Sequence, residues 1–268
     1  PRLAKAIKSE PGDENPYVYF ADAQLRIDQN HDAARTALEK ALEINPDHPK
    51  ATALLGEAEA ASGRKEAALD AFQRALETSL RMDPYWGPRI TLGLGKTALE
   101  LGQVDTALAT LKEGYEKDPD HIGLIQGLAE AYRSANLVGD AQGLLTKTLD
   151  DFSQDTEILD WLTSFSLEID LPNLAVQALE TLIKNKPQDH ANYLRLGKSH
   201  LEAGNKQQAI GSFTSLSGID DVNPELLLES GSSLINLGEI ETGLKSLSKA
   251  ALVCESNPDS GTLLGKIY

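Results

Sequence analysis

A period of 34 residues runs through the chain and constrains its fold more than any other feature. A repeat carries a Leu-Gly pair, a second glycine seven residues after the first, and an alanine five residues further on. The pattern is complete where the pair is Leu55-Gly56, Leu94-Gly95 or Leu196-Gly197. Self-similarity at such a period is typical of stacked helical hairpins, because one hairpin cannot bury its apolar face alone. We therefore expect an elongated array with an extended binding surface and no built-in catalytic pocket.

The same spacing accounts for the whole chain as one array, 1–268. The seven full repeats are expected at 15–48, 49–87, 88–121, 122–155, 156–189, 190–223 and 224–257, with five extra residues in the second. Residues 1–14 match a second helix alone, and residues 258–268 match a first helix alone or a cap. Since both ends fall in the middle of a repeat, we interpret the chain as a segment of a longer protein.

Within a repeat, the apolar residues have the spacing of two amphipathic helices. In the second repeat, Ala68, Phe72 and Ala75 recur at intervals of four and three, as residues on one helix face do. Gly63 lies between the two expected helices, where a glycine can adopt positive φ. No stretch sustains the period of two that a strand requires, so the sequence predicts an all-α fold.

The extra residues of the second repeat lie in the segment Ser79 to Pro88. We expect this segment to lengthen the second helix by a turn before a proline-rich corner. Tyr85 and Trp86 then either form a lateral contact patch or cover the lengthened helix.

This pattern resembles the tetratricopeptide repeat, and the resemblance covers the whole chain. The sixth repeat carries the matching residues Tyr193, Leu196, Gly197, Gly204, Ala209 and Phe213. The fourth and fifth repeats depart from the family, with Asn136 and Asp170 where it has glycine. The resemblance implies an all-α, right-handed superhelical solenoid of stacked antiparallel helix pairs. It also implies a concave groove, lined by the first helices, that binds an extended peptide or a partner helix.

Family positions that face this groove identify the candidate binding residues of the chain. These residues comprise aromatic, cationic, amide and acidic side chains: Tyr19, Lys96, Gln126, Arg133, Asp160, Trp161, Arg195 and Lys198. The same positions also include Glu57, Arg89, Leu194 and Glu229. Three lysines directly follow a Leu-Gly pair: Lys96, Lys198 and Lys266. Together with Arg133 and Arg195, they either bind carboxylates and carbonyls of a ligand or are solvated cations. Trp161 is either an interaction hot spot or a contact to the neighbouring repeat.

Composition narrows the class of partner. The net charge of −16 argues against nucleic acid or an anionic membrane surface, and it favours a basic or neutral protein or peptide. No apolar run approaches the ~18 residues that span a bilayer, so we expect no direct membrane insertion. The single cysteine, Cys254, excludes an internal disulfide, and the histidines lack the spacing of metal ligands. We therefore expect no catalytic residues, no metal site and no cofactor.

Three functions fit these features. The first is a non-catalytic protein–protein interaction scaffold. The second is the accessory repeat region of a larger machine, such as a bacterial polysaccharide-export or glycosyltransferase system. The third is a scaffold that assembles with itself through uncapped ends. The sequence is compatible with either a cytoplasmic or a periplasmic location.

Overall fold

The computed structural model describes residues 9–78 and 83–255, and every regular element within these ranges is a helix. The all-α prediction is therefore confirmed for this part of the chain. Contacts divide the chain into an N-terminal unit, Pro1–Ala141, and a C-terminal unit, Gln142–Tyr268. The division falls within helix α9 (Val138–Asp151).

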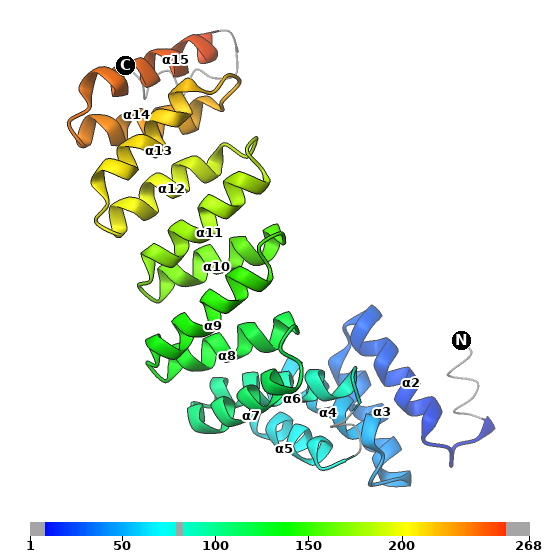
Figure 1. The fold of residues 1–268 in the computed structure, drawn as a ribbon. Coiled ribbons are helices and arrows are strands. Elements are labelled where there is room, and N and C mark those ends of the chain that lie inside the picture. The colour runs from blue at the N-terminus through cyan, green and yellow to red at the C-terminus, as the bar shows by residue number, and fades with distance from the viewer. Residues whose placement is uncertain (1–8, 79–82, 256–268) are drawn as a thin grey trace. The chain divides into compact units, whose positions relative to one another are not determined.

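In the N-terminal unit, helical hairpins follow one another along the chain (Figure 1). Its helices before α9 are α2 (Asn15–Ala23), which continues as the π-helix η1 (Gln24–Asp28), α3 (His31–Ile44), α4 (Pro49–Ala61), α5 (Lys65–Leu76), α6 (Trp86–Glu100), α7 (Val104–Lys117) and α8 (Ile122–Ser134). Each helix from α2 to α8 packs on the next. The first helices of successive hairpins also touch: α2 contacts α4, α4 contacts α6, and α6 contacts α8.

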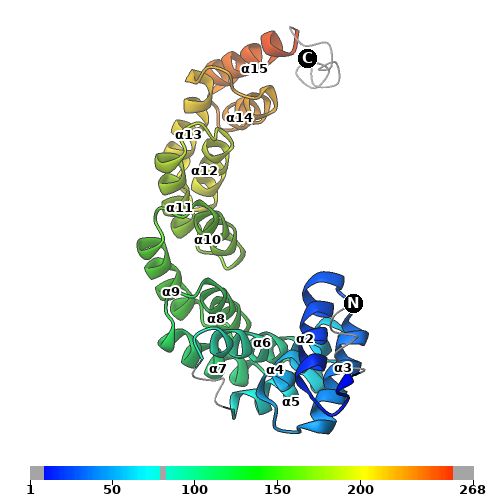
Figure 2. The ribbon, with the colours of Figure 1, turned by 90° about the vertical axis from the view of Figure 1, so that its right-hand side faces the viewer.

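The C-terminal unit repeats this arrangement. After α9 it contains α10 (Thr156–Glu168), α11 (Pro172–Asn185), α12 (Ala191–Glu202), α13 (Lys206–Gly218), α14 (Pro224–Asn236) and α15 (Ile240–Glu255). Figure 2 shows α10, α12 and α14 along one side of this unit, with α11 and α13 along the opposite side. First and second helices therefore form separate rows, as hairpin stacking predicts.

The turn inside each hairpin has left-handed backbone at one fixed repeat position. The residues at this position have φ between 50° and 95°: Gln29, Gly63, Gly102, Asn136, Asp170, Gly204 and Gly238. The conformation thus persists where glycine is replaced. Amide and short acidic side chains tolerate this region better than most residues do. The departures at Asn136 and Asp170 consequently leave the hairpins intact.

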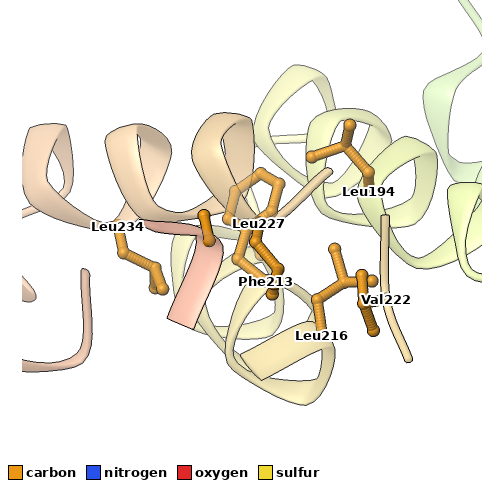
Figure 3. Packing of buried hydrophobic residues seen from close by; sticks show 8 residues of the cluster. Leu194, Phe213, Leu216, Val222, Leu227 and Leu234 are labelled. Atoms are coloured by element: carbon orange, nitrogen blue, oxygen red, sulfur yellow. The ribbon is translucent and has the colours of Figure 1, made fainter. Parts of the chain in front are cut away.

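The core of the C-terminal unit shows how hairpins are joined (Figure 3). Phe213 of α13 is fully buried and belongs to one cluster with Leu194 of α12 and with Leu227 and Leu234 of α14. One second-helix aromatic therefore shares a core with its own first helix and with the next hairpin. The expectation that Leu194 faces a groove is wrong, because its side chain is only 5% exposed and packs in this cluster, where its apolar surface is removed from water.

The insertion of the second repeat starts α6 early and does not lengthen α5. Helix α5 ends at Leu76, and α6 begins at Trp86. Oδ1 of Asp83 accepts hydrogen bonds from the backbone N–H groups of Tyr85 and Trp86 at 2.9 and 3.0 Å. These bonds satisfy donors that a helix start would otherwise leave without partners. The predicted lengthening of the second helix is thus wrong. The hydrogen bonds to Asp83 start α6 within the insertion, so the end of the insertion belongs to the following helix.

Some sequence predictions concern residues that the structure does not describe. The partial repeat at 258–268, including Lys266, lies outside the described residues, as does most of the partial repeat at 1–14. Of the helices in the described part of the chain, none combines the length and the apolar character that crossing a bilayer requires.

Candidate peptide-binding face

The candidate binding residues all lie on first helices of hairpins. They occupy α2, α6 and α8 in the N-terminal unit and α10 and α12 in the C-terminal unit. Five of them are exposed: Tyr19, Lys96, Arg133, Asp160 and Lys198. The other three are half-buried: Gln126, Trp161 and Arg195. We call the exposed side of the first helices within each unit its first-helix face.

Helix periodicity places Lys96 on the first-helix face of the N-terminal unit. Ile90, Leu94 and Ala98 recur every four residues along α6 and are buried. They form the core-facing side of the helix, and Lys96 lies on the other side. The Lys96 ammonium has no ion-pair or hydrogen-bond partner among residues 9–78 and 83–255. Gln126 on the neighbouring α8 likewise has no hydrogen-bond partner in the described part of the chain.

Small residues bring α8 close to α6 beside these two side chains. A Cβ added to Gly123 would lie 2.8 Å from Leu92 Cδ2, and one added to Gly127 would lie 3.0 Å from Leu92 Cδ1. Leu92 therefore packs on the α8 backbone itself. The local surface combines this apolar contact with the polar groups of Lys96 and Gln126.

In the C-terminal unit, the predicted charges pair with each other. Nη1 of Arg195 lies 2.5 Å from Oδ1 of Asp160, and it also donates to Oδ1 of Asn192 at 2.9 Å. Nζ of Lys198 lies 2.6 Å from Oε1 of Glu229. These ion pairs link α10 to α12 and α12 to α14. The cations of this face are thus held by carboxylates of neighbouring hairpins.

Arg133 and Trp161 have partners within their own helix, whereas Tyr19 on α2 is 62% exposed. Arg133 pairs with Glu130 on α8, with Nη2 and Oε2 separated by 2.6 Å. The ring of Trp161 is stacked on the buried ring of Phe165, with centroids 5.5 Å apart and planes inclined by 25°. Trp161 therefore uses part of its surface for packing in α10 and leaves part open to solvent.

A polar and aromatic cluster on the N-terminal unit contains Tyr85 and Trp86, for which the sequence left a lateral contact patch or a covering role open, together with arginine partners that were not predicted. The hydroxyl oxygen of Tyr85 accepts a hydrogen bond from Arg26 Nη2 at 2.7 Å and one from Arg89 Nη1 at 2.9 Å. The guanidinium of Arg89 lies over the Trp86 ring, 4.8 Å from its centroid, and both oxygens of Glu57 accept from it. The insertion thus connects η1 to the start of α6. The charges of Glu57 and Arg89, 32 residues apart, were a signal for part of this cluster.

Arg26 and Asp83 have shifted pKa values that follow from these contacts. The hydrogen bond to Tyr85, and then the one to Asp22, raise the pKa of the Arg26 guanidinium. The backbone N–H groups of Trp86 and Tyr85 lower the pKa of Asp83. Both groups are therefore charged at neutral pH, which keeps the cluster and its helix start in place.

Three of the histidines have structural positions. Nδ1 of His48 accepts from the Ala51 N–H at 3.2 Å, and Nδ1 of His121 accepts from the Leu124 N–H at 3.3 Å. Both side chains thus cap helix starts. His200 is buried, which lowers its pKa, and its Nδ1 has no hydrogen-bond partner in the part of the chain that the structure describes. In the residues described, no group of three or more His, Cys, Asp or Glu side chains is arranged to hold a metal ion.

One hollow of about 420 Å³ lies away from the candidate residues. It is formed by the start of α6 and the end of α7 and is lined by Asp83, Pro84, Gly87, Pro88, Thr91, Gly114, Lys117 and Asp118. It is open to solvent and contains no candidate binding residue.

Rows of first and second helices with left-handed turns define a helical-hairpin repeat protein. Two family models, both described as tetratricopeptide repeat, match the chain. One matches residues 20–85 and 171–224, and the other matches residues 98–163. Together these matches cover more than half of the chain. The chain therefore belongs to the tetratricopeptide-repeat family.

Individual relatives are distant. The chain is 23% identical over 234 residues to the TPR repeat-containing protein YpiA of Bacillus subtilis, an alignment that covers 87% of this chain and 54% of YpiA. It thus spans about half the length of that curated relative.

Two solved structures share the fold. A tetratricopeptide-repeat protein of Parabacteroides merdae is 16% identical, with a TM-score of 0.54 and coverage of 95% of this chain and 96% of that one. The C-terminal part of a TPR repeat-containing protein of Cytophaga hutchinsonii is 11% identical, with a TM-score of 0.65 and coverage of 91% and 97%.

Proposed function

We propose that the chain is a non-catalytic protein-interaction scaffold that binds an extended peptide or a partner helix on the first-helix face of one of its units. The observation that carries this proposal is the presence of two neighbouring first-helix side chains, the exposed Lys96 and the half-buried Gln126, whose polar groups have no partner in the described part of the chain. A partner that supplies acceptors and donors satisfies these groups without breaking an internal bond. The family resemblance supports the same face.

The charge of the chain narrows the partner. A net charge of −16 repels nucleic acid and favours a protein or peptide that is neutral or basic as a whole. The first-helix face of the N-terminal unit offers aromatic contact at Tyr19, which is 62% exposed, and the first-helix face of the C-terminal unit offers it at Trp161. Aromatic side chains contribute strongly at interfaces, so these two residues are the proposed anchors.

A pair of charge reversals tests the proposal. A peptide is selected from a random library on the full chain, and its affinity is measured by titration calorimetry. Lys96→Glu on α6 should weaken binding roughly tenfold, which corresponds to ~1.4 kcal/mol. Lys112→Glu on the exposed side of α7 makes the same change in net charge on a second helix and should leave the affinity unchanged. Equal effects of the two substitutions would refute binding on the first-helix face.

A second candidate function is self-association through α15. In two other second helices, the residue at the repeat position of Leu244 is buried, with Leu69 9% and Val176 8% exposed, whereas Leu244 is 52% exposed. Leu252 on the same helix is 67% exposed. We propose that a second copy covers this apolar surface. Sedimentation over a range of concentrations should show a dimer that Leu244→Glu dissociates and Leu201→Glu on α12 does not; a monomer at all concentrations would refute the idea.

A further inference from the structure

The insertion of the second repeat places one tyrosine hydroxyl between two arginines of the N-terminal unit. Arg26 belongs to η1 of the first hairpin, and Arg89 belongs to α6 of the third. Both guanidinium groups donate to the Tyr85 oxygen. A phenol has one hydrogen and two acceptor lone pairs. The two arginines therefore occupy the acceptor positions, and the hydroxyl hydrogen has to point away from both of them.

The outer edge of this cluster offers hydrogen-bond donors without acceptors. The Tyr85 hydroxyl hydrogen has no acceptor among residues 9–78 and 83–255, and neither does Arg26 Nη1. Nε of Arg26 is already used by Asp22, at 2.7 Å from Oδ1. Both oxygens of Glu57 are used by Arg89. The Tyr85 side chain is 54% exposed, so this donor edge is open to solvent.

The edge is also held in one orientation. The Tyr85 ring meets the Trp86 ring edge to face, with centroids 5.4 Å apart, and Trp86 is 8% exposed. The Arg89 guanidinium lies 5.6 Å from the Tyr85 centroid. Ring packing and two hydrogen bonds fix the phenol, so little conformational entropy of this side chain is lost when a ligand binds there. Donors beside two guanidinium groups form the strongest hydrogen bonds with a charged acceptor.

We propose that the Tyr85 hydroxyl and Arg26 bind a carboxylate of an acidic side chain in the partner segment. This inference rests on the proposed function and adds one position of chemical specificity to it. It is compatible with a partner that is neutral or basic as a whole, because only one acidic residue is required. The site depends on the insertion at the end of the second repeat, which is not part of the 34-residue pattern.

Peptides selected on the full chain from a random library provide the probe. For each binder, a set of variants replaces every Asp by Asn and every Glu by Gln, one at a time, and affinities are measured by calorimetry. We expect one acidic position at which the replacement weakens binding about tenfold, the value of one charge-assisted hydrogen bond. Tyr85→Phe keeps the ring and removes the hydroxyl, and Arg26→Gln removes the guanidinium. Either substitution should abolish this discrimination between the acid and its amide.

Arg74→Gln is the matched control for Arg26→Gln, because it removes an exposed guanidinium from the second helix α5, away from the first-helix face. It should leave the discrimination intact. The proposal is overturned if the Arg26→Gln and Arg74→Gln chains discriminate between acid and amide equally well, or if no binder contains an acidic position at which the replacement weakens binding. In both results peptides still bind, so the proposed function survives. Failure of every selected peptide to bind the chain in solution would overturn both.

Discussion

The ring of Phe72 occupies the space beside Gly56: a Cβ added to Gly56 would lie 2.6 Å from Phe72 Cδ1. The same ring also meets α6, where a Cβ added to Gly93 would lie 2.5 Å from Phe72 Cζ. Phe72 is 2% exposed, so it is enclosed between two first helices. The first glycine of the repeat is therefore needed because an aromatic ring of the second helix takes the place of its side chain.

Gly56→Ala should destabilise the chain by about 1–3 kcal/mol, because the methyl group overlaps a buried ring that cannot move away. Gly211→Ala on α13 is the control, since nothing lies within 4 Å of a Cβ there. It should stabilise by about 0.5–1 kcal/mol through the loss of glycine flexibility in a helix. Urea denaturation followed by circular dichroism measures both changes. Stabilisation by both substitutions would contradict this prediction, because it would show that the Phe72 ring moves away from the added methyl group.

The left-handed turn position predicts opposite effects on stability for adding and for removing a glycine. Asp170 has φ of 60° at a position where glycine is the least strained residue. Asp170→Gly should stabilise by roughly 0.5–1 kcal/mol, because the relief of left-handed strain outweighs the larger backbone entropy that glycine loses on folding. Gly102→Ala, at φ of 71°, should destabilise by about 1 kcal/mol. Thermal melting of the two variants checks this, and shifts in the same direction would contradict it.

The fold could be predicted because its determinants recur at every repeat. The Leu-Gly pair and the second glycine mark close helix packing and the turn in each hairpin, so single departures such as Asn136 do not obscure the pattern. The start of α6 could not be predicted, since it depends on one local bond acceptor, Asp83, within an insertion that has no counterpart in the period. Leu194 was wrongly predicted to face the groove, because the repeat position of a residue does not give the rotation of its helix about the helix axis.

The candidate site was predicted less completely. The period places Lys96 and Gln126 on first helices, but it does not give the distances between side chains that decide which charges pair. Asp160 and Arg195 are 35 residues apart, close to the period, and a search for opposite charges at such spacings would have found their ion pair. The contact of Arg26 with Tyr85 spans 59 residues and depends on the insertion, so periodicity contains no signal for it.

The ion pair of Asp160 and Arg195 should contribute little to stability. Their side chains are 56% and 35% exposed, and exposed pairs contribute roughly 0–1 kcal/mol. A double-mutant cycle with Asp160→Asn and Arg195→Gln, measured by urea denaturation, should give a coupling free energy below about 1 kcal/mol that decreases with salt. A coupling above about 2 kcal/mol that is insensitive to salt would mean that the pair holds α10 and α12 together.

His200 should make stability depend on pH in the weakly acidic range. Burial lowers its pKa in the folded chain, and the Glu180 carboxylate opposes this shift only in part. The unfolded chain takes up the proton near the ordinary pKa of about 6.5, before the folded chain does. Stability is therefore full above about pH 6.5 and falls as the pH drops towards the folded-state pKa.

His200→Tyr removes the titrating imidazole and keeps an aromatic ring at the same position. The dependence of the urea midpoint on pH between about 5 and 7 should be flatter in this variant than in the original chain. Identical slopes in the two chains would show that His200 does not contribute.

Locating a bound peptide on the chain tests the central claim most directly. A library-selected peptide that carries a photoreactive benzophenone is bound to the full chain, irradiated, and its attachment sites are identified by mass spectrometry. The account predicts attachment to the first helices α4, α6 and α8, or to α10, α12 and α14. Attachment confined to the second helices α5, α7, α11 and α13 would contradict it.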